Sequence, residues 1–319
     1  MKNRSFLTLA VLSAPTFLLG PARACDLCSV YTASEAEGGG KGFFSGVAEQ
    51  FTHFNTLQSG GQTVANDGES IDGLNSQVFI GYNFNPHFGL QLNLPVIYRQ
   101  YRRQFTSVDD GHVLSPATRN ETGVGDSSLV GNFRAYKYSG DDFTFGWTVL
   151  GGIKFPTGGT GQLNPANPDF ATGIGGHDLT FGSGSYDGLA GTGFSARWKR
   201  LFLIGEMQYS IRTAGAFDYR FANDWSWSGG PGGYLVLEDN YSVAFQAAVS
   251  GESKGQDTIA GVPTDDTALT IVYLGPQIDF TWSDKLSVNV GADLPVSIAS
   301  AGNQLVPDYR IHAAVTWRF

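Results

Sequence analysis

Apolar and polar residues alternate with a period of two along most of the chain. In the segment 308–319 one face is apolar and is formed by Tyr309, Ile311, Ala313, Val315, Trp317 and Phe319. The opposite face carries Asp308, Arg310, His312, Ala314, Thr316 and Arg318. The same alternation is found in 88–99, 143–155, 241–250 and 286–298. This pattern is typical of β-strands with one apolar face and predicts an all-β protein.

Three features favour a transmembrane barrel over a soluble sandwich, whose strands also alternate. The apolar face from Leu286 to Ile298 runs for seven alternate positions, enough for the roughly ten residues of a tilted membrane strand. Aromatic residues lie at the ends of such faces, as the girdles of outer-membrane barrels require; they include Phe143, Tyr241, Trp282 and Trp317. The final residue, Phe319, follows an alternating segment and resembles the C-terminal signal that the bacterial barrel-assembly machinery recognises. We therefore expect a closed transmembrane antiparallel β-barrel.

We expect twelve strands, joined alternately by short and longer connections. The strands are predicted at 42–56, 75–84, 87–104, 123–138, 143–156, 186–199, 201–213, 217–237, 240–253, 266–282, 285–299 and 307–319. Short turns rich in Asn, Asp, Gly and Ser are expected at 83–87, 138–142, 199–200, 238–240 and 283–284. The other connections are longer, apart from 214–216. This asymmetry predicts short periplasmic turns, long external loops and both termini on the periplasmic side.

The composition agrees with a strand-rich chain and excludes other classes. Glycine supplies 43 of the 319 residues, nearly twice its ordinary share of about 7%. Because glycine is costly inside helices, a helical bundle is disfavoured. Aromatic residues at 13% argue against disorder, and two cysteines exclude a disulfide scaffold.

Residues 1–24 are expected to be a secretory signal peptide. A basic start precedes a short apolar stretch, and 22–24 has the Ala-Arg-Ala sequence of a cleavage site. Cleavage before Cys25 leaves 25–41 as a short periplasmic segment, a candidate helix or plug, and 42–319 as the barrel. A lipid anchor on Cys25 is the alternative, although the third residue before it is Ala rather than the usual Leu.

The chain that remains is acidic. The full sequence has 20 Lys and Arg against 29 Asp and Glu, a formal net charge of −9. The signal segment holds Lys2, Arg4 and Arg23 and no acid, so its removal leaves 17 basic residues against 29 acidic ones and a net charge of −12. This sign disfavours nucleic acid as a partner. We expect the bacterial outer membrane as the location, with membrane lipid around the barrel.

If the apolar faces contact lipid, the alternate positions line the lumen. Candidates for the channel lining are Glu49, Arg99, Arg103, Asp126, Arg134, Lys154, Arg197, Glu206, Asp279, Asp293 and Arg310, together with His53 and Arg318. Such charges either pair to fill a narrow barrel or line a water-filled path and set its field for a solute. Twelve strands lie between filled eight-stranded barrels and open sixteen-stranded porins. We therefore expect a narrow or partly plugged channel.

The connection 157–185 is 29 residues long and rich in Gly, Asn and Pro. Loops of this length are either functional or disordered. One possibility is that it folds inward as a constriction or gates access from outside. The other is a flexible external loop.

Cys25 and Cys28 form a CxxC pair and are the two cysteines of the chain. In an oxidising periplasm the ordinary outcome is a disulfide or unreactive thiols. The alternative is a soft-metal or redox site. No histidine follows Cys28 directly, which excludes the motif for c-type haem attachment. We expect no other cofactor.

The sequence shows no pattern that favours an enzyme. Its five histidines are scattered without an HExxH spacing, and it contains no GxSxG. An outer-membrane phospholipase needs a Ser–His pair on its lipid-facing surface, and the expected lumen position of His312 argues against one. An outer-membrane hydrolase is therefore the third hypothesis, after a channel and a metal- or redox-associated barrel.

Three segments resemble the phenol meta-pathway family of outer-membrane transporters. They are Gly123-Val124-Gly125-Asp126, Gly152-Ile153-Lys154-Phe155-Pro156-Thr157-Gly158 and Gly182-Ser183-Gly184-Ser185-Tyr186-Asp187-Gly188. With their flanking strands they cover about 120–200, and the N-terminal CxxC departs from ordinary members. The resemblance implies passive or facilitated uptake of small compounds, including aromatic or hydrophobic ones. It also implies a structural role for Asp126, Lys154 and Asp187 around the long loop.

Overall fold

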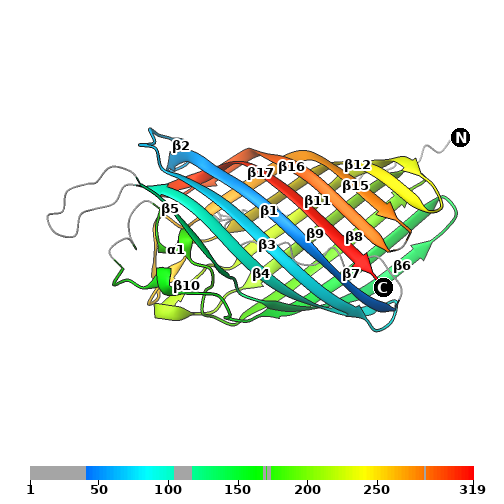
Figure 1. Cartoon of the computed structure of the whole chain (residues 1–319), viewed down its shortest axis with the longest axis horizontal. Helices are drawn as coiled ribbons and strands as arrows, with labels where there is room; N and C mark the ends of the chain where they lie inside the picture. Colours follow the sequence, from blue (N-terminus) through cyan, green and yellow to red (C-terminus); the bar gives the residue numbers. More distant parts are fainter. Residues whose placement is uncertain (1–40, 104–116, 168–169, 171–173, 284) are drawn as a thin grey trace, which may run out of the picture.

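The computed structural model describes residues 41–103, 117–167, 170, 174–283 and 285–319, and these form a closed antiparallel β-barrel (Figure 1). Each wall strand pairs with its neighbours, and the last strand, β17 (Asn303–Arg318), pairs with the first, β1 (Gly42–Ser59), to close the sheet. The pairing Val47↔Val315 lies within that closing ladder. The sequence-based prediction of an all-β barrel with twelve strands is confirmed.

The other wall strands follow one another along the chain. They are β3 (Ser70–Asn83), β4 (Phe88–Arg103), β5 (Ala117–Val124), β6 (Ser128–Ser139), β7 (Phe143–Lys154), β8 (Asp187–Trp198), β9 (Leu201–Ile211), β11 (Asp224–Leu237), β12 (Tyr241–Lys254), β15 (Leu269–Trp282) and β16 (Leu286–Ser300). Short elements in the loops are β2 (Gln62–Thr63), η3 (Gly161–Leu163), α1 (Gly176–Leu179), η4 (Ala216–Asp218), β10 (Tyr219–Arg220), β13 (Thr258–Ile259) and β14 (Val262–Pro263). Among the described residues no helix has the length and apolar character to cross a membrane.

The fourth strand position of the barrel wall is occupied by two separate strands, β5 and β6. Both pair with β4, β6 along Phe88 to Asn93 and β5 along Val96 to Arg103. The sequence pattern predicted one strand at 123–138 and a loop before it. Instead, the wall begins earlier, and the chain steps inward at 125–127, where Asp126 is held by buried partners described below. Among the described residues β7 pairs with β6 but not with β5, and Phe181 of the connection between β7 and β8 lies against Gly123 of β5.

Short turns gather at one end of the barrel and the longer connections at the other (Figure 1). We call these the periplasmic and external ends, following the usual arrangement of outer-membrane barrels. Two connections differ from the prediction. The one between β9 and β11 is long, because Phe217 and Asp218 have φ of 58° and 55° and form the η4 turn where a strand was predicted. The link between β16 and β17 is instead the short one at the external end, 301–302.

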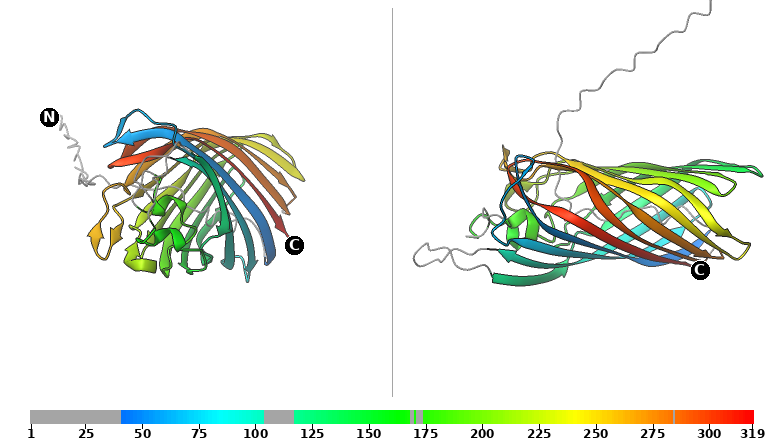
Figure 2. Two further views of the ribbon diagram at one scale, coloured as in Figure 1. Left: turned by 60° about the vertical axis from the view of Figure 1, so that its left-hand side comes forward. Right: turned by 90° about the horizontal axis from the view of Figure 1, so that it is seen from above.

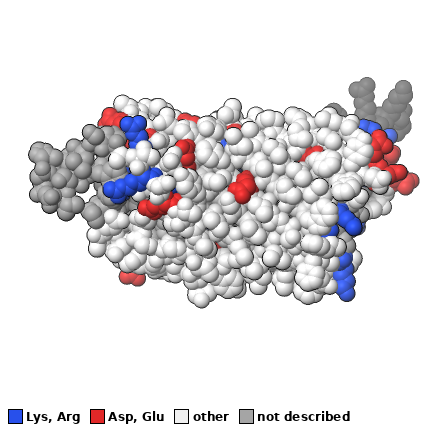
Figure 3. Space-filling view, in the orientation of Figure 1, with Lys and Arg blue, Asp and Glu red and all other residues white. Residues whose placement is uncertain are grey.

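Residues along each strand alternate between an outer and an inner face. On β4 the outer positions Leu92, Leu94 and Val96 are 37–43% exposed, whereas Gln91 and Asn93 are buried inside. Figure 3 shows that charged residues on the face in view lie mainly toward the two ends, with an almost uncharged wall between them. This is the surface expected of a barrel wall in contact with acyl chains.

One predicted outward position is wrong. Ile298 was expected to continue the apolar outer face of β16, but it packs on the buried interior residues Leu269, Ile271, Tyr273 and Val306. The β15–β16 ladder shifts register between Val272 and Tyr273. Such an irregularity changes which face of a strand a side chain points to.

Apolar side chains fill the external half of the barrel interior. One cluster joins Phe54, Ile71 and Tyr101 of the wall to Ile174 and Leu179 of the loop between β7 and β8. A second joins Leu163 of the same loop to Tyr219 and Phe221. Figure 2 shows α1 inside the rim of the external end. The loop is therefore folded into the barrel, which favours the inward alternative of the two that the sequence left open.

Candidate functional site

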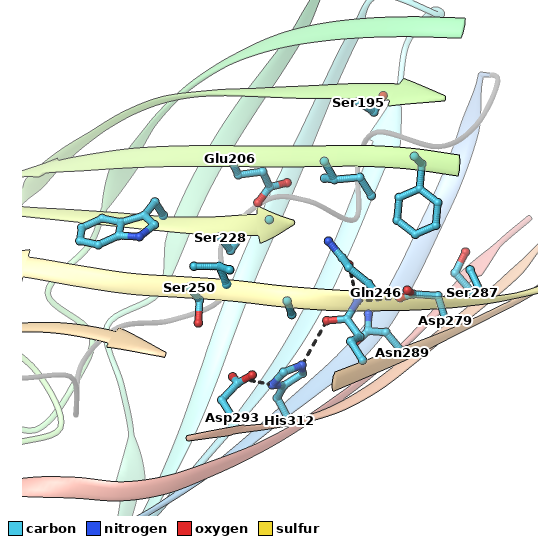
Figure 4. Close-up of a pocket in the computed structure, with 18 of the residues that line it drawn as sticks. Ser195, Glu206, Ser228, Gln246, Ser250, Asp279, Ser287, Asn289, Asp293 and His312 are labelled. Carbon is cyan, nitrogen blue, oxygen red and sulfur yellow. Dashed lines mark hydrogen bonds and ion pairs between the residues drawn. The ribbon is translucent and has the colours of Figure 1, made fainter. Parts of the chain in front are cut away.

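A cavity of about 540 Å³, lined by charged, hydroxyl and amide side chains together with apolar ones, occupies the periplasmic half of the barrel. Its lining comes from the inner faces of β8, β9, β11, β12 and β15 to β17 (Figure 4). Arg197, Ser242, Ser287 and Arg318 line it within a few residues of the short periplasmic turns. The cavity thus lies on the periplasmic side of the filled external half.

A chain of hydrogen bonds runs across one side of this cavity. Nδ1 of His312 lies 3.3 Å from Oδ2 of Asp293, and its Nε2 lies 3.2 Å from Oε1 of Gln277. The Gln277 amide in turn donates to Oδ1 of Asp279 at 2.7 Å (Figure 4). These side chains come from three neighbouring strands, β15, β16 and β17. Because each residue is oriented by the next, the polar wall is held in one arrangement.

Arg310 and Asp293 form a buried ion pair in the cavity wall. Nη2 and Nε of Arg310 lie 2.7 and 3.0 Å from the same carboxylate oxygen, and Asp293 is only 2% exposed. The guanidinium also lies 4.1 Å from the centre of the Tyr273 ring and donates to the Ser250 hydroxyl. A charge pair this deep is stable only when its remaining hydrogen bonds are made.

An aromatic and basic group lies on the other side of the cavity. Arg197 on β8 pairs directly with Phe202 on β9, and the rings of Phe202 and Tyr234 are 5.4 Å apart. All three residues line the cavity, as does Glu206 on β9. The cavity therefore offers charges of both signs beside aromatic surface.

A buried charge network holds the two roots of the inward loop. Lys154, at the end of β7, lies 2.5 Å from Asp126 and 2.9 Å from Asp187. Asp187 also pairs with Arg212 at 3.2 Å, and Arg212 with Asp224 at 2.6 Å. Asp126 accepts from the backbone N–H groups of Gly158 and Ser183 on opposite sides of the loop, both at 2.9 Å. The network thus joins the start and the end of the loop to the wall.

Further contacts hold the middle of the loop inside the barrel. The buried guanidinium of Arg103 donates to the carbonyl of Ile174. Arg99, also on the inner face of β4, is 1% exposed, and its charge acts on the α1 residue Asp178. Opposite them, Asp257 accepts from Lys254 and from the Tyr219 hydroxyl at 2.9 and 2.7 Å. These contacts hold the described parts of the loop against the inner wall at the external end.

His177 and Asp178 form an ion pair within α1, with Nε2 3.2 Å from Oδ1. Burial by itself lowers the pKa of His177, but the Asp178 carboxylate outweighs it and the pKa is raised. Burial raises the pKa of Asp178, but the His177 charge and the hydrogen bond from Gly175 outweigh it and the pKa is lowered. Both shifts favour the charged pair.

Glu49 and His53 were predicted to line the lumen, and the structure places them elsewhere. Glu49 and His53 lie on the outer wall, because β1 buries the positions of opposite parity, such as Phe44 and Thr52. Arg134 has the inward parity of Val130 on β6, but it lies outside the cavity lining, at the periplasmic end, where it donates to the carbonyl of Pro86 in the turn between β3 and β4. The alternation assigned β1 to the wrong phase because its outer face carries polar residues.

The remaining candidates divide between two levels. Arg99, Arg103, Asp126 and Lys154 belong to the external closure, and Arg197, Glu206, Asp279, Asp293, Arg310 and Arg318 line the periplasmic cavity. Cys25 and Cys28 lie outside the described residues, so their proposed metal, redox or disulfide chemistry stays a prediction. Within the described ranges no group of three or more His, Cys, Asp or Glu residues is placed to hold a metal ion.

Sequence reasoning missed several members of both levels. Gln246 and Gln277 carry no charge and were passed over, although they lie on the polar face of alternating strands. Arg212, Asp224 and Asp257 lie at strand ends or in loops, where no alternation marks the inward direction. A search for every polar residue at an inward position would have found the glutamines.

Comparison with known proteins gives a fold but no family. No family model matches the sequence, and no curated protein matches it. The COG4313 outer membrane channel from Pseudomonas putida F1 is 13% identical, with 91% of this chain and all of that chain covered at a TM-score of 0.60. The NalP autotransporter translocator domain from Neisseria meningitidis is 14% identical over 88% of this chain and 90% of that one, with a TM-score of 0.41. The toluene transporter TbuX from Ralstonia pickettii is 7% identical over 88% and 90%, with a TM-score of 0.37.

At this identity the first match shows a shared fold alone, and the other two scores are too low to support an argument. The chain therefore has the architecture of a bacterial outer-membrane β-barrel.

Proposed function

We propose that this protein is an outer-membrane channel for small solutes, closed at its external end in the conformation described. The main support for this proposal is a cavity with charged and hydrogen-bonding side chains inside a barrel whose outer wall is apolar. A barrel with a purely structural role has no need of a cavity of about 540 Å³ lined by charges of both signs. The inward loop between β7 and β8 is the part that would have to move for solute to pass.

The cavity lining favours small aromatic compounds that carry a polar or anionic group. Phe202 and Tyr234 provide ring surface, and Arg197 provides a guanidinium next to it. Guanidinium groups recognise carboxylates through paired hydrogen bonds. Bare hydrocarbons fit less well, because the same cavity is lined by Glu206, Asp279 and many hydroxyl and amide groups that would lose water contacts.

The motifs behind the family resemblance support the same proposal. Asp126, Lys154, Ser183 and Asp187 come from the three resembling segments, and they meet in one network at the roots of the loop. Membership in the phenol meta-pathway family would explain why these segments occur together. The role we propose for them is to hold the closing loop.

The test uses channel recordings in planar bilayers and liposome swelling. The roots of the loop meet, because the N–H groups of Phe181 and Gly182 donate to the Gly159 carbonyl at 3.2 and 3.0 Å. Residues 160–180 can therefore be replaced by two glycines without straining the wall. We expect stepwise conductance that increases several-fold in the shortened variant. A barrel that stays sealed in both forms would refute the proposal.

A second experiment tests which class of solute the cavity recognises. In the shortened variant, Arg197→Gln should slow the uptake of benzoate while leaving that of an uncharged sugar of similar size unchanged. Arg200→Gln is the matched control, because Arg200 is exposed in the periplasmic turn and lies outside the cavity lining. Equal effects of the two variants on benzoate would refute recognition by Arg197.

We also propose that the barrel-assembly machinery recognises Phe319. The residue is 77% exposed, and its N–H donates to the Phe43 carbonyl at 2.9 Å, which continues the closing ladder. Replacing it by Ala should lower the amount of folded barrel in outer membranes, with little effect on refolding in detergent. A loss in both settings would indicate a structural role.

A further inference from the structure

Glu49 lies on the outer wall of the barrel, among residues that contact lipid. Its neighbours on the same face of β1 are Val47, which is 40% exposed, and Phe51, whereas Ala48 on the other face is 7% exposed. Directly paired with Glu49 are Ala313 on β17 and Ser76 on β3. We call Ala313, Glu49 and Ser76 the carboxyl row.

The carboxyl row crosses the middle of the apolar belt. Ala313 is equally far along β17 from Trp317, near the periplasmic end, and from Tyr309, toward the external end. These two aromatic residues mark the levels of the two interfaces. A carboxyl group halfway between them faces hydrocarbon, where it finds no water.

The other polar side chains on this wall differ from Glu49. His53 and Asp72 lie toward the external end, where they pair at 2.6 Å beside Tyr309, and Asp308 accepts from Thr56 near the same level. Oε2 of Glu49 accepts a hydrogen bond from the Ser76 hydroxyl at 2.6 Å. No Lys, Arg or His of the described wall pairs with it. Polar groups at this depth are costly, and those that persist in membrane proteins usually serve a function.

The surroundings of Glu49 are shaped for close approach. Ala313 and Ser76 are small, whereas the next outer positions along their strands are Ile311, Val315, Leu74 and Val78. The row is thus a shallow dip flanked by larger side chains. Within membranes, small residues let backbones approach and polar side chains hydrogen-bond across the contact.

We propose that the carboxyl row is the centre of an interface between two copies of this chain, related by a twofold axis beside Glu49. A twofold contact joins a surface to itself and therefore needs donors and acceptors on the same patch. The row has both, a hydroxyl and a carboxyl group, and the Ser45 hydroxyl lies on the same face of β1. Across the axis each polar group meets polar groups of the other copy, which acyl chains cannot supply. The interface is independent of the channel proposal.

The experiment measures association in lipid vesicles. Full-length protein with Cys25→Ser, Cys28→Ser and Gln62→Cys is labelled with donor or acceptor dye on the exposed β2 hairpin, and energy transfer is followed as lipid dilutes the protein. We expect transfer to persist on dilution for this protein and for Glu49→Gln, whose amide keeps hydrogen-bonding groups. For Glu49→Leu, dissociation should occur at a several-fold higher protein density.

Two controls make the outcome decisive. Ile278→Ala changes an exposed outer residue on β15, away from the row, and should leave the dilution curve unchanged. Ser76→Ala keeps the carboxyl group but removes its donor, and should weaken association as Glu49→Leu does, which covers the case that the Leu variant folds poorly. Transfer no greater than for randomly distributed barrels, or equal curves for Glu49→Leu, Ser76→Ala and Ile278→Ala, would overturn the proposal.

Discussion

Lys154 and Asp187 are directly paired across the β7–β8 ladder, and the ammonium lies 2.9 Å from a carboxylate whose side chain has no exposed surface. The pair lies where the wall ends and the inward loop begins and returns. The Lys154 ammonium also lies 2.5 Å from the carboxylate of Asp126, in the segment between β5 and β6. One cation therefore joins three separate segments at the base of the external closure.

Removing that cation should destabilise the barrel strongly. Lys154→Met leaves the carboxylates of Asp126 and Asp187 buried with fewer partners, and breaking a buried ion pair in this way costs about 3–5 kcal/mol. Lys199→Met is the matched control, because the Lys199–Asp142 pair is 60% and 67% exposed and such pairs contribute about 1 kcal/mol or less. Urea titrations of both variants refolded in detergent measure the difference. A loss no larger than that of the control would contradict the role given to Lys154.

The pH dependence of the closure should follow the His177–Asp178 pair. The pKa of His177 is raised above 6.5, so its contribution is fully present below pH 6.5 and is lost as pH rises through the raised value. The lowered pKa of Asp178 gives a contribution that is present above pH 3.8 and lost as pH falls. The charges of Lys254 and Asp257 also act on His177, and the charge of Arg99 acts on Asp178.

We therefore expect conductance to rise as pH is raised from about 6 to 9, as the loop loosens. In His177→Gln this pH dependence should be flatter, and single-channel recordings across the range provide the measurement. An identical slope in both proteins would mean that another group controls the loop.

Close packing at Gly275 predicts a stability loss for a very small substitution. A Cβ on Gly275 would lie 1.9 Å from the Ala292 carbonyl oxygen and 2.6 Å from Oδ1 of Asp293. Gly275→Ala should therefore destabilise the barrel by about 1–3 kcal/mol, as overpacking does. Gly151→Ala, whose Cβ would meet its nearest atom at 3.9 Å, should change stability by about 0.5 kcal/mol or less. Equal urea midpoints for the two variants would show that the backbone at Gly275 adjusts freely.

The acidic residues of the cavity should contribute to its ion selectivity. In the variant without residues 160–180, Glu206→Gln combined with Asp279→Asn removes two negative charges and leaves Arg197 and Arg310 in the lining. The reversal potential in a KCl gradient should then move toward the value for chloride. Asp142→Asn, in an exposed periplasmic turn, should leave it in place. A reversal potential unmoved by the double substitution would place the ion path elsewhere.

The local pattern of the sequence was sufficient to predict the strands of the barrel wall. On β4 and β12 the alternation assigned the lipid-facing and inward residues correctly, because the side-chain period of a strand is two and an apolar face is favourable in lipid. The asymmetry of turns and loops indicated the two ends. Even so, β1 was assigned to the wrong phase, because Glu49 and His53 make its outer face look like a lumen face.

Only the tertiary structure decided what the barrel contains. Lys154, Asp126 and Asp187 are far apart in sequence and meet because antiparallel pairing places β6, β7 and β8 side by side. The inward fold of the loop depends on apolar contacts between Ile174, Leu179 and the wall, which no periodic pattern records. A strand's own sequence specifies its two faces. A cavity and its closure depend on how segments far apart in the sequence pack together in the interior of the barrel.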